Sequence, residues 1–337
     1  MKREKLVMAL VFCAFMSSSC GYAELNNDER KAYKKGAYLR TTFKILDTDG
    51  KPVAGAYIQA GYSSPRKDGN WSKGHTNTNG LYTATGHTSD RMTYTVTKDG
   101  YYESGGEYFP FRKASPQVTG DKWQPWNPTL TVVLKQKKNP IRMYAKIVSA
   151  EVPVLGKPVG YDLVKGDWVK PHGDGEHSDF IFTVDGTYVS PLDRQALLSL
   201  TFSNEHDGIQ EFRQTKESGR VGQSELISPY LAPADGYQAK WSYKKKIAPT
   251  REGRINADKR KDLHFFFRVR TEVDQEGKII KAMYGKIYDD IECDFRDFKS
   301  KTMGVYFTYY LNPDGTRNIE FNSENLFKEK YRRIWRP

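Results

Sequence analysis

The densest group of side chains able to do chemistry lies between residues 167 and 179, with two histidines and four carboxylates in thirteen positions. Imidazoles beside carboxylates suit zinc, and carboxylates beside backbone carbonyls suit calcium. The spacing matches no standard metal loop, and its glycines equally mark a simple surface turn. We therefore treat His172, Asp174 and His177 as weak metal candidates and expect no cofactor.

A second group of reactive side chains lies at residues 289–297. Asp290, Glu292 and Asp294 alternate with apolar residues, which places them on one face of a strand. Paired acids of this kind could cleave a glycosidic bond, but a single sequence does not reveal the opposing acid, and a solvated surface explains them equally well. Cys293 is a poor nucleophile candidate because its acidic neighbours raise a thiol pKa.

Aromatic rings beside lysines form the third candidate site, which would bind a ligand. The chain holds 22 Tyr, 17 Phe and 6 Trp, and Trp241 and Tyr243 stand directly before Lys244, Lys245 and Lys246. Exposed rings can stack on sugar faces, and lysines attract acidic polymers. Packing in a core is the alternative for each ring. Other rings in polar company are Trp71, Tyr101, Tyr102, Trp123 and Trp126.

Standard catalytic motifs are missing from the sequence. It contains no Gly-x-Ser-x-Gly elbow, phosphate-binding loop, dinucleotide fingerprint or His-Glu-x-x-His pattern. The sequence therefore favours a non-catalytic binding or envelope-associated protein that recognises carbohydrate or an acidic cell-surface polymer. The first alternative is an extracellular carbohydrate-active hydrolase or lyase. The second alternative is a structural component of a surface assembly.

Residues 1–23 have the order of an export signal: a charged start, an apolar stretch from Leu6 to Met16, and small residues ending at Ala23. The apolar stretch is too short to span a bilayer, so we expect a periplasmic or extracellular protein with no transmembrane segment. Ser19-Cys20 resembles the end of a lipoprotein box, although Ser17 stands where such boxes usually carry Leu. Cys20 is thus a candidate for lipid attachment.

The charge of the chain limits its partners. The formal net charge is +12, and removal of the signal, which contributes +2, leaves +10 (12 minus 2). An exported basic protein meets lipid head groups, cell-wall polymers or acidic glycans rather than nucleic acid, while a solvated basic surface that aids solubility is the simpler explanation. Cleavage after Ala23 would leave Cys293 alone, so stability must come from packing and not from an intramolecular disulfide.

The elements that must position these residues are mostly short strands. Residues 24–37 are polar and aperiodic and are predicted to form a flexible leader. Residues 38–137 alternate apolar and polar positions between the turn signals Asp49-Gly50, Asn79-Gly80 and Asp99-Gly100. Closely spaced turns of this kind predict an antiparallel β-sandwich.

Three segments of this region resemble a carboxypeptidase regulatory-like domain. They are the opening from Phe43 to Ile58 with its Asp-Gly-Lys-Pro-Val-Ala-Gly-Ala core, the hairpin from Gly74 to Tyr82, and the strand end Lys98-Asp99-Gly100-Tyr101. The resemblance implies a transthyretin-like sandwich of the seven-stranded type, an accessory module with no activity of its own. Asn77 stands where the family often has Asp, which puts in doubt any cation bound at that turn.

The charged run ending at Pro140 marks the expected boundary, after which residues 141–337 are predicted to form a larger β-sandwich or jelly-roll domain. The clearest feature there is a long hairpin that pairs residues 263–273 with residues 279–288. The expected fold class is therefore all-β, with the smaller sandwich first. We expect the recognition surface on the second domain.

Overall fold

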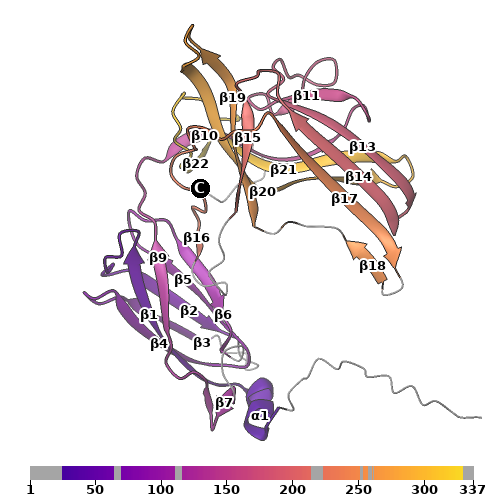
Figure 1. Cartoon of the computed structure of the whole chain (residues 1–337). Coiled ribbons are helices and arrows are strands. Elements are labelled where there is room, and N and C mark those ends of the chain that lie inside the picture. The colour runs from indigo at the N-terminus through magenta and orange to yellow at the C-terminus, as the bar shows by residue number, and fades with distance from the viewer. Residues whose placement is uncertain are drawn as a thin grey trace, which may run out of the picture.

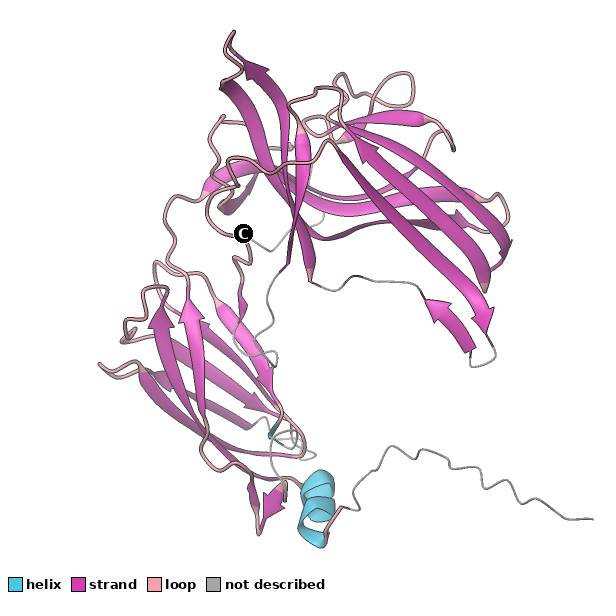
Figure 2. Ribbon diagram, in the orientation of Figure 1, coloured by secondary structure: helices cyan, strands magenta, loops and turns pink. Residues whose placement is uncertain are grey.

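The computed structural model describes residues 25–63, 70–110, 116–213, 223–250, 253–256, 260 and 262–328. Strands dominate these residues (Figures 1 and 2), and the all-β prediction is confirmed. The predicted signal, residues 1–23, and the lipid candidate Cys20 lie outside the described residues. No helix among the described residues combines the length and apolar character needed to cross a membrane.

The prediction of a flexible leader over residues 24–37 is wrong. Most of its described residues form helix α1 (Asn27–Lys35). Asn26 and Glu29 cap its first turn reciprocally: Asn26 Oδ1 accepts from the Glu29 backbone N–H at 2.9 Å, and Glu29 Oε2 accepts from the Asn26 N–H at 2.8 Å. Ala32 is buried in the first hydrophobic core. A capping box and one buried alanine thus order a segment that has no apolar periodicity.

Two sheets enclose that first core, which we call the first sandwich. One sheet has the order β4-β1-β8-β7 with β9 also paired to β1, and the other has the order β16-β6-β5-β2-β3. The strands are β1 (Ala37–Asp47), β2 (Tyr57–Tyr62), β3 (Asn70–His75), β4 (Leu81–Thr88), β5 (Met92–Thr97), β6 (Ser104–Tyr108), β7 (Val118–Thr119), β8 (Lys122–Trp123), β9 (Thr129–Leu134) and β16 (Gln223–Ser224).

Strand β16 comes from far along the chain. Gln223 pairs with Gly105 and Ser224 pairs with Ser104, so the later half of the sequence extends the second sheet of the first sandwich at the edge strand β6. Pairing also covers backbone groups that an edge strand would otherwise leave open to another chain.

The rest of the chain forms a second sandwich of two six-stranded sheets, ordered β15-β19-β20-β21-β10-β22 and β12-β11-β13-β14-β17-β18. The strands are β10 (Ile141–Glu151), β11 (Pro158–Asp162), β12 (Asp167–Trp168), β13 (Phe180–Ser190), β14 (Asp193–Thr201), β15 (Gly208–Arg213), β17 (Lys240–Thr250), β18 (Gly253–Asn256), β19 (Leu263–Val273), β20 (Ile279–Asp297), β21 (Thr302–Asn312) and β22 (Phe321–Asn325). The predicted long hairpin is present as β19 and β20.

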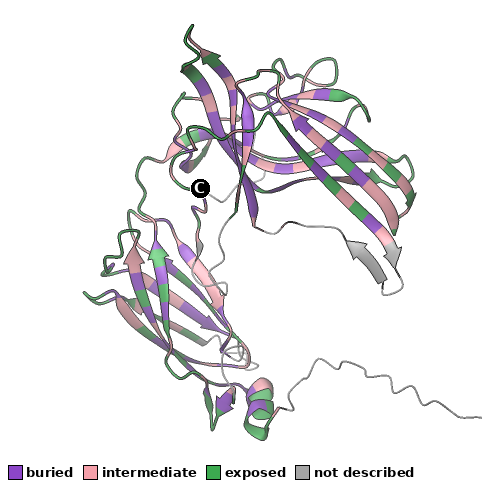
Figure 3. Ribbon diagram, viewed as in Figure 1, coloured by how far each residue is buried: buried purple, intermediate pink, exposed green. Residues whose placement is uncertain are grey.

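Alternation of buried and exposed positions follows the strands of the first sandwich (Figure 3). In β5, for example, Met92, Tyr94 and Val96 are buried while the threonines between them face outward. In the second sandwich, β19, β20 and β21 instead contain runs of consecutive buried residues. The core of the second sandwich is rich in aromatic rings, including Phe180, Phe267 and others that meet edge to face. Burial of these rings stabilises the second sandwich, where Cys293 is a free thiol.

The junction between the sandwiches depends on one buried carboxylate, Glu320. Its oxygens accept hydrogen bonds from the Tyr102 hydroxyl at 2.8 Å and from the backbone N–H groups of Lys138 and Asn139 at 2.8 and 2.7 Å. Tyr102 belongs to the first sandwich, and Lys138 and Asn139 form the connection to β10. The carboxylate therefore ties both sandwiches and their linker together.

We predict that Glu320→Gln lowers the free energy of unfolding by about 2 kcal/mol, because the amide must turn its NH₂ group toward at least one donor and hydrogen bonds to a charge are lost. Chemical denaturation measures the change. Glu324→Gln is the matched control, because Glu324 is an exposed partner of Arg142 and its loss costs little. Equal stability of the two variants would contradict the role of Glu320.

Candidate functional site

The outward side of the β16-β6-β5-β2-β3 sheet carries the exposed residues with the best geometry for a ligand. In β2, Ile58, Ala60 and Tyr62 are buried, so Tyr57, Gln59 and Gly61 belong to the other side. The register then adds residues from the neighbouring strands. We call this surface the aromatic face; it comprises Tyr57, Gln59, Gly61, Trp71, Lys73, His75, Thr93, Thr95, Thr97, Gly105 and Glu107.

Trp71 forms a platform at one end of the aromatic face. It pairs directly with Gly61, and a Cβ atom on Gly61 would lie 2.7 Å from Trp71 Cζ3, so the indole packs against the glycine backbone. Trp71 is nevertheless 52% exposed. Lys73 Nζ lies 5.6 Å from the ring centroid and is carried by a flexible side chain that a ligand can displace. The absence of a side chain at Gly61 thus allows the indole to pack on the sheet while staying accessible.

A cleft of about 530 Å³ lies at the other end of the face. Tyr57 and His75 line it with ring centroids 5.1 Å apart, and Tyr101 adds a third ring. Because Tyr57 and Gly61 are four residues apart on β2, the cleft and the Trp71 platform are separated by about 13 Å. This length suits an extended ligand of several units.

The second half of the chain supplies one wall of this cleft. Glu225 follows β16 directly, and its backbone N–H donates to the Glu103 carbonyl at 2.8 Å. Burial and the charge of Glu103 raise the pKa of Glu225, and Lys137 opposes this effect. Further charges on the lining are Lys98 and Asp99. Cations and anions are therefore mixed in the cleft, and the basic excess of the chain is not concentrated there.

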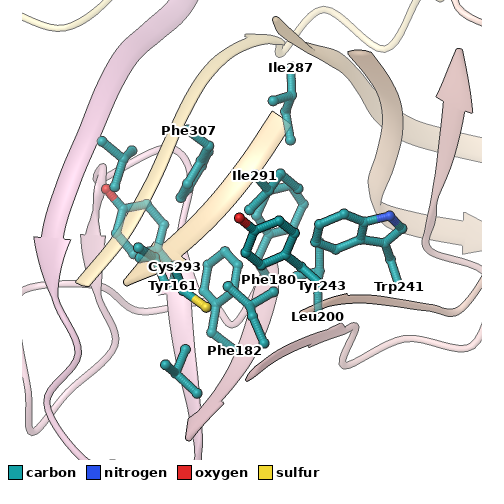
Figure 4. Packing of buried hydrophobic residues seen from close by; sticks show 14 of the residues in the cluster. Tyr161, Phe180, Phe182, Leu200, Trp241, Tyr243, Ile287, Ile291, Cys293 and Phe307 are labelled. Carbon is teal, nitrogen blue, oxygen red and sulfur yellow. The ribbon is translucent and has the colours of Figure 1, made fainter. Parts of the chain in front are cut away.

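The prediction that Trp241 and Tyr243 form an exposed aromatic platform for a ligand is wrong. They are only 8% and 5% exposed, and their rings stack on each other inside the core with centroids 6.3 Å apart (Figure 4). Trp241 Nε1 donates to Glu211 Oε1 at 2.9 Å, and the Arg260 guanidinium covers both rings. Neither ring offers a free face for a sugar.

The three lysines after Tyr243 do not act as one group. Lys244 and Lys246 are exposed, whereas Lys245 lies on the opposite side of β17 and donates to Asp294 Oδ2 at 2.7 Å. Strand alternation divides any run of consecutive residues in this way. The five predicted ligand residues therefore do not form one site. The two rings are buried in the core, Lys245 is in an ion pair, and the other two lysines are exposed.

The predicted metal candidates lie in a loop that is organised by other residues. His172 and Asp174 are exposed, and His177 Nδ1 lies 3.8 Å from Asp162 Oδ2. Backbone N–H groups occupy the carboxylates of the loop: Asp162 accepts from Glu176 and His177, and Asp167 accepts from Asp174. Within the described ranges, no group of three or more His, Cys, Asp or Glu side chains is arranged to hold a metal ion.

Two of the three acids that suggested glycosidic cleavage, Asp290 and Asp294, are paired with arginine and lysine side chains of the fold. Asp290 pairs with Arg260 at 2.9 Å, and Asp294 pairs with Arg194 at 3.0 Å and with Lys245. Burial raises the pKa of Asp290 despite Arg260, whereas for Asp294 the hydrogen bonds from Arg194 and Lys245 outweigh burial and lower the pKa. Arg194 and Lys245 lie on β14 and β17, so Asp294 links the two sheets of the second sandwich.

Comparison with known proteins does not assign a function to the chain. No family model matches the chain, and no curated protein matches it. Among solved structures, 3-chlorocatechol 1,2-dioxygenase from Rhodococcus opacus 1CP is 11% identical with a TM-score of 0.24, over 30% of this chain and 61% of the dioxygenase. A DUF3823 family protein from Parabacteroides merdae is 9% identical with a TM-score of 0.19, over 82% of this chain and 96% of that protein. BcpA, the major pilin subunit of Bacillus cereus, is 11% identical with a TM-score of 0.21, over 80% and 95%.

We predict that a chelator leaves the thermal midpoint of the protein unchanged, because backbone N–H groups already occupy the carboxylates of the 162–179 loop. Differential scanning calorimetry with and without EDTA measures this. A downward shift that one divalent ion reverses, and that His172→Ala abolishes, would instead establish a metal site.

Cys293 should be unreactive toward thiol reagents in the native protein at pH 8. It is completely buried, and burial together with the Asp294 charge raises its pKa to about 12. A colorimetric disulfide reagent should label a form lacking residues 1–23 only after unfolding. Rapid stoichiometric labelling of the native protein would contradict this assignment.

Proposed function

We propose that the protein is an exported, non-catalytic binding protein that recognises a carbohydrate chain along the aromatic face of its first sandwich. The observation that carries the proposal is Trp71, an exposed indole packed on Gly61 in line with a ring-lined cleft. Sugars bind such platforms through apolar contact with the ring face and through hydrogen bonds to flanking polar groups. Gln59, Lys73 and three threonines supply those polar groups.

Export and domain organisation belong to the same proposal. Residues 1–23 have the composition of a secretory signal, and Cys20 offers a lipid tether, so the protein would act in the periplasm or at the cell surface. The resemblance of residues 38–137 to a carboxypeptidase regulatory-like module is consistent with a binding role for the first sandwich, because such modules carry no catalytic centre.

Recognition of an acidic polymer through charge alone is the second candidate. It is favoured by the mature charge of +10 (12 minus 2) and by the exposed Lys244 and Lys246. Charge-driven retention weakens steeply with salt because exposed charges are screened beyond about 8 Å at physiological ionic strength. Ring stacking is far less sensitive to salt, so salt dependence separates the two candidates.

We predict that Trp71→Ala weakens retention on immobilised polysaccharides about tenfold at every salt concentration, because one stacking contact contributes about 1.4 kcal/mol. Affinity electrophoresis on neutral and acidic polysaccharides measures retention. Trp126→Ala is the matched control: Trp126 is 37% exposed and also lies under a lysine, Lys122, but belongs to a different part of the sandwich.

Two results would overturn the proposal. Equal retention of the Trp71 and Trp126 variants would remove the aromatic face from consideration. Retention confined to acidic polysaccharides at low salt, and reduced by replacement of Lys244 and Lys246 with Ala, would favour the charge-driven candidate instead.

A further inference from the structure

A larger cleft, of about 590 Å³, opens at one end of the second sandwich, where the two sheets meet. We call it the rim cleft. Three segments form it: the approach to β13 at residues 176–179, the β14–β15 connection at residues 203–207, and the β19–β20 hairpin at residues 270–272, 281 and 283. None of these segments belongs to the first sandwich, so the rim cleft is separate from the aromatic face.

Arg270, on the floor of the rim cleft, has a backbone conformation that side chains rarely adopt, with φ of 55°. The β19–β20 register shifts at this position, so the strand carries a bulge. Asp207 stabilises the bulge by accepting the Arg270 and Thr271 backbone N–H groups at 3.1 and 3.0 Å. Bulges and strained residues of this kind commonly aim a side chain at a functional site.

The bulge directs the Arg270 guanidinium to two buried carboxylates. Its Nε and Nη2 donate to Asp179 at 2.8 Å, and Nη2 also donates to Asp162 at 2.9 Å. Nη1 takes part in none of these hydrogen bonds. Arg270 is thus rigidly held and still has two N–H groups to offer a ligand.

Thr271 adds a buried hydroxyl to the rim cleft. The residue is 4% exposed and lines the cleft, and its hydroxyl lies near enough to the Asp207 carboxylate to lower the pKa of that group. Among the described residues, Asp207 is the acceptor that this hydroxyl faces, so Thr271 Oγ1 can still accept a hydrogen bond from a ligand.

Charges and hydrogen-bonding groups define the class of ligand. Asp162 and Asp179 pair with the Arg270 guanidinium, and Asp207 also feels the charge of Arg268. The three carboxylates outnumber these two guanidiniums, which disfavours an anion. Lys281 is paired with Glu272 at 2.6 Å. Burial raises the pKa of Asp179 and Asp207 against the hydrogen bonds they accept. A pair of neighbouring hydroxyls fits, because each hydroxyl can donate to a carboxylate or to Thr271 Oγ1 while accepting from Arg270 Nη1.

We propose that the rim cleft is a second saccharide site, which binds the neighbouring hydroxyls of a neutral sugar through Arg270, Thr271 and Asp207. Ser203, Asn204 and His177 line its walls and supply further polar contacts. The protein then has two sites on different sandwiches and can hold two points of one polymer or two separate chains. Simultaneous engagement of both sites strengthens retention beyond that of either site.

The test uses the mature full chain and the methyl glycosides of glucose, galactose and mannose at millimolar concentration. We expect at least one of them to bind saturably in an NMR titration. Thr271→Val should weaken this binding about fivefold, the effect of one hydrogen bond. Thr41→Val is the matched control, because Thr41 is also a buried strand threonine but lies in the first sandwich, away from the rim cleft.

The outcomes separate this inference from the proposed function. Binding that Thr271→Val weakens and that Trp71→Ala and Thr41→Val leave intact supports the rim cleft. Binding that falls in Trp71→Ala and is unchanged in Thr271→Val overturns the rim cleft and supports the aromatic face. Absence of binding by all three glycosides, or equal effects of the two valine substitutions, also overturns the rim cleft, whereas polysaccharide retention tests the aromatic face independently.

Discussion

A single buried carboxylate, Glu320, determines how the two sandwiches meet. Its side chain is removed from water and is tolerable there only because Tyr102 and two backbone N–H groups donate to it. Close to it, Lys286 is completely buried against the rings of Tyr288 and Tyr310, and burial lowers the pKa of this lysine. Ionisable groups so deeply buried demand one arrangement of their partners, so the junction is geometrically specific.

The aromatic face depends on that junction. Residues 223–225 reach the first sandwich from the second half of the chain, where β16 pairs with β6 and Glu225 completes the wall of the cleft. Lys135 Nζ strengthens this contact by donating to the Ser228 carbonyl at 3.1 Å. The proposed glycan site is therefore a property of both halves of the chain, even though most of its residues belong to the first sandwich.

Buried and half-buried ion pairs explain why acidic residues that suggested catalysis serve the fold. Asp294 joins Arg194 and Lys245 across the two sheets, and Asp162 and Asp179 hold Arg270 at the rim. Removing one partner from such a pair leaves a buried charge uncompensated, so these acids cannot change protonation freely without cost. The ion pairs around Arg270 also border a cleft and include a backbone position of positive φ, which is why they support a binding site.

The sequence alone determined the all-β class, the alternation of strands such as β5, and the long hairpin of β19 and β20, because turn residues and side-chain period are local properties. The spacing of Asn26 and Glu29 is a local capping signal in the expected leader, but the burial of Ala32 against the first core depends on residues distant in sequence. The sequence also could not distinguish Trp71 from Trp241: both stand in polar company, but Gly61 opposes the first across a strand pair and the facing sheet covers the second. Three features depend on segments distant in sequence: the exposure of a ring, the pairing of β16 with β6, and the approach of Asp207 to Arg270. Only the tertiary structure therefore decided where a ligand can bind.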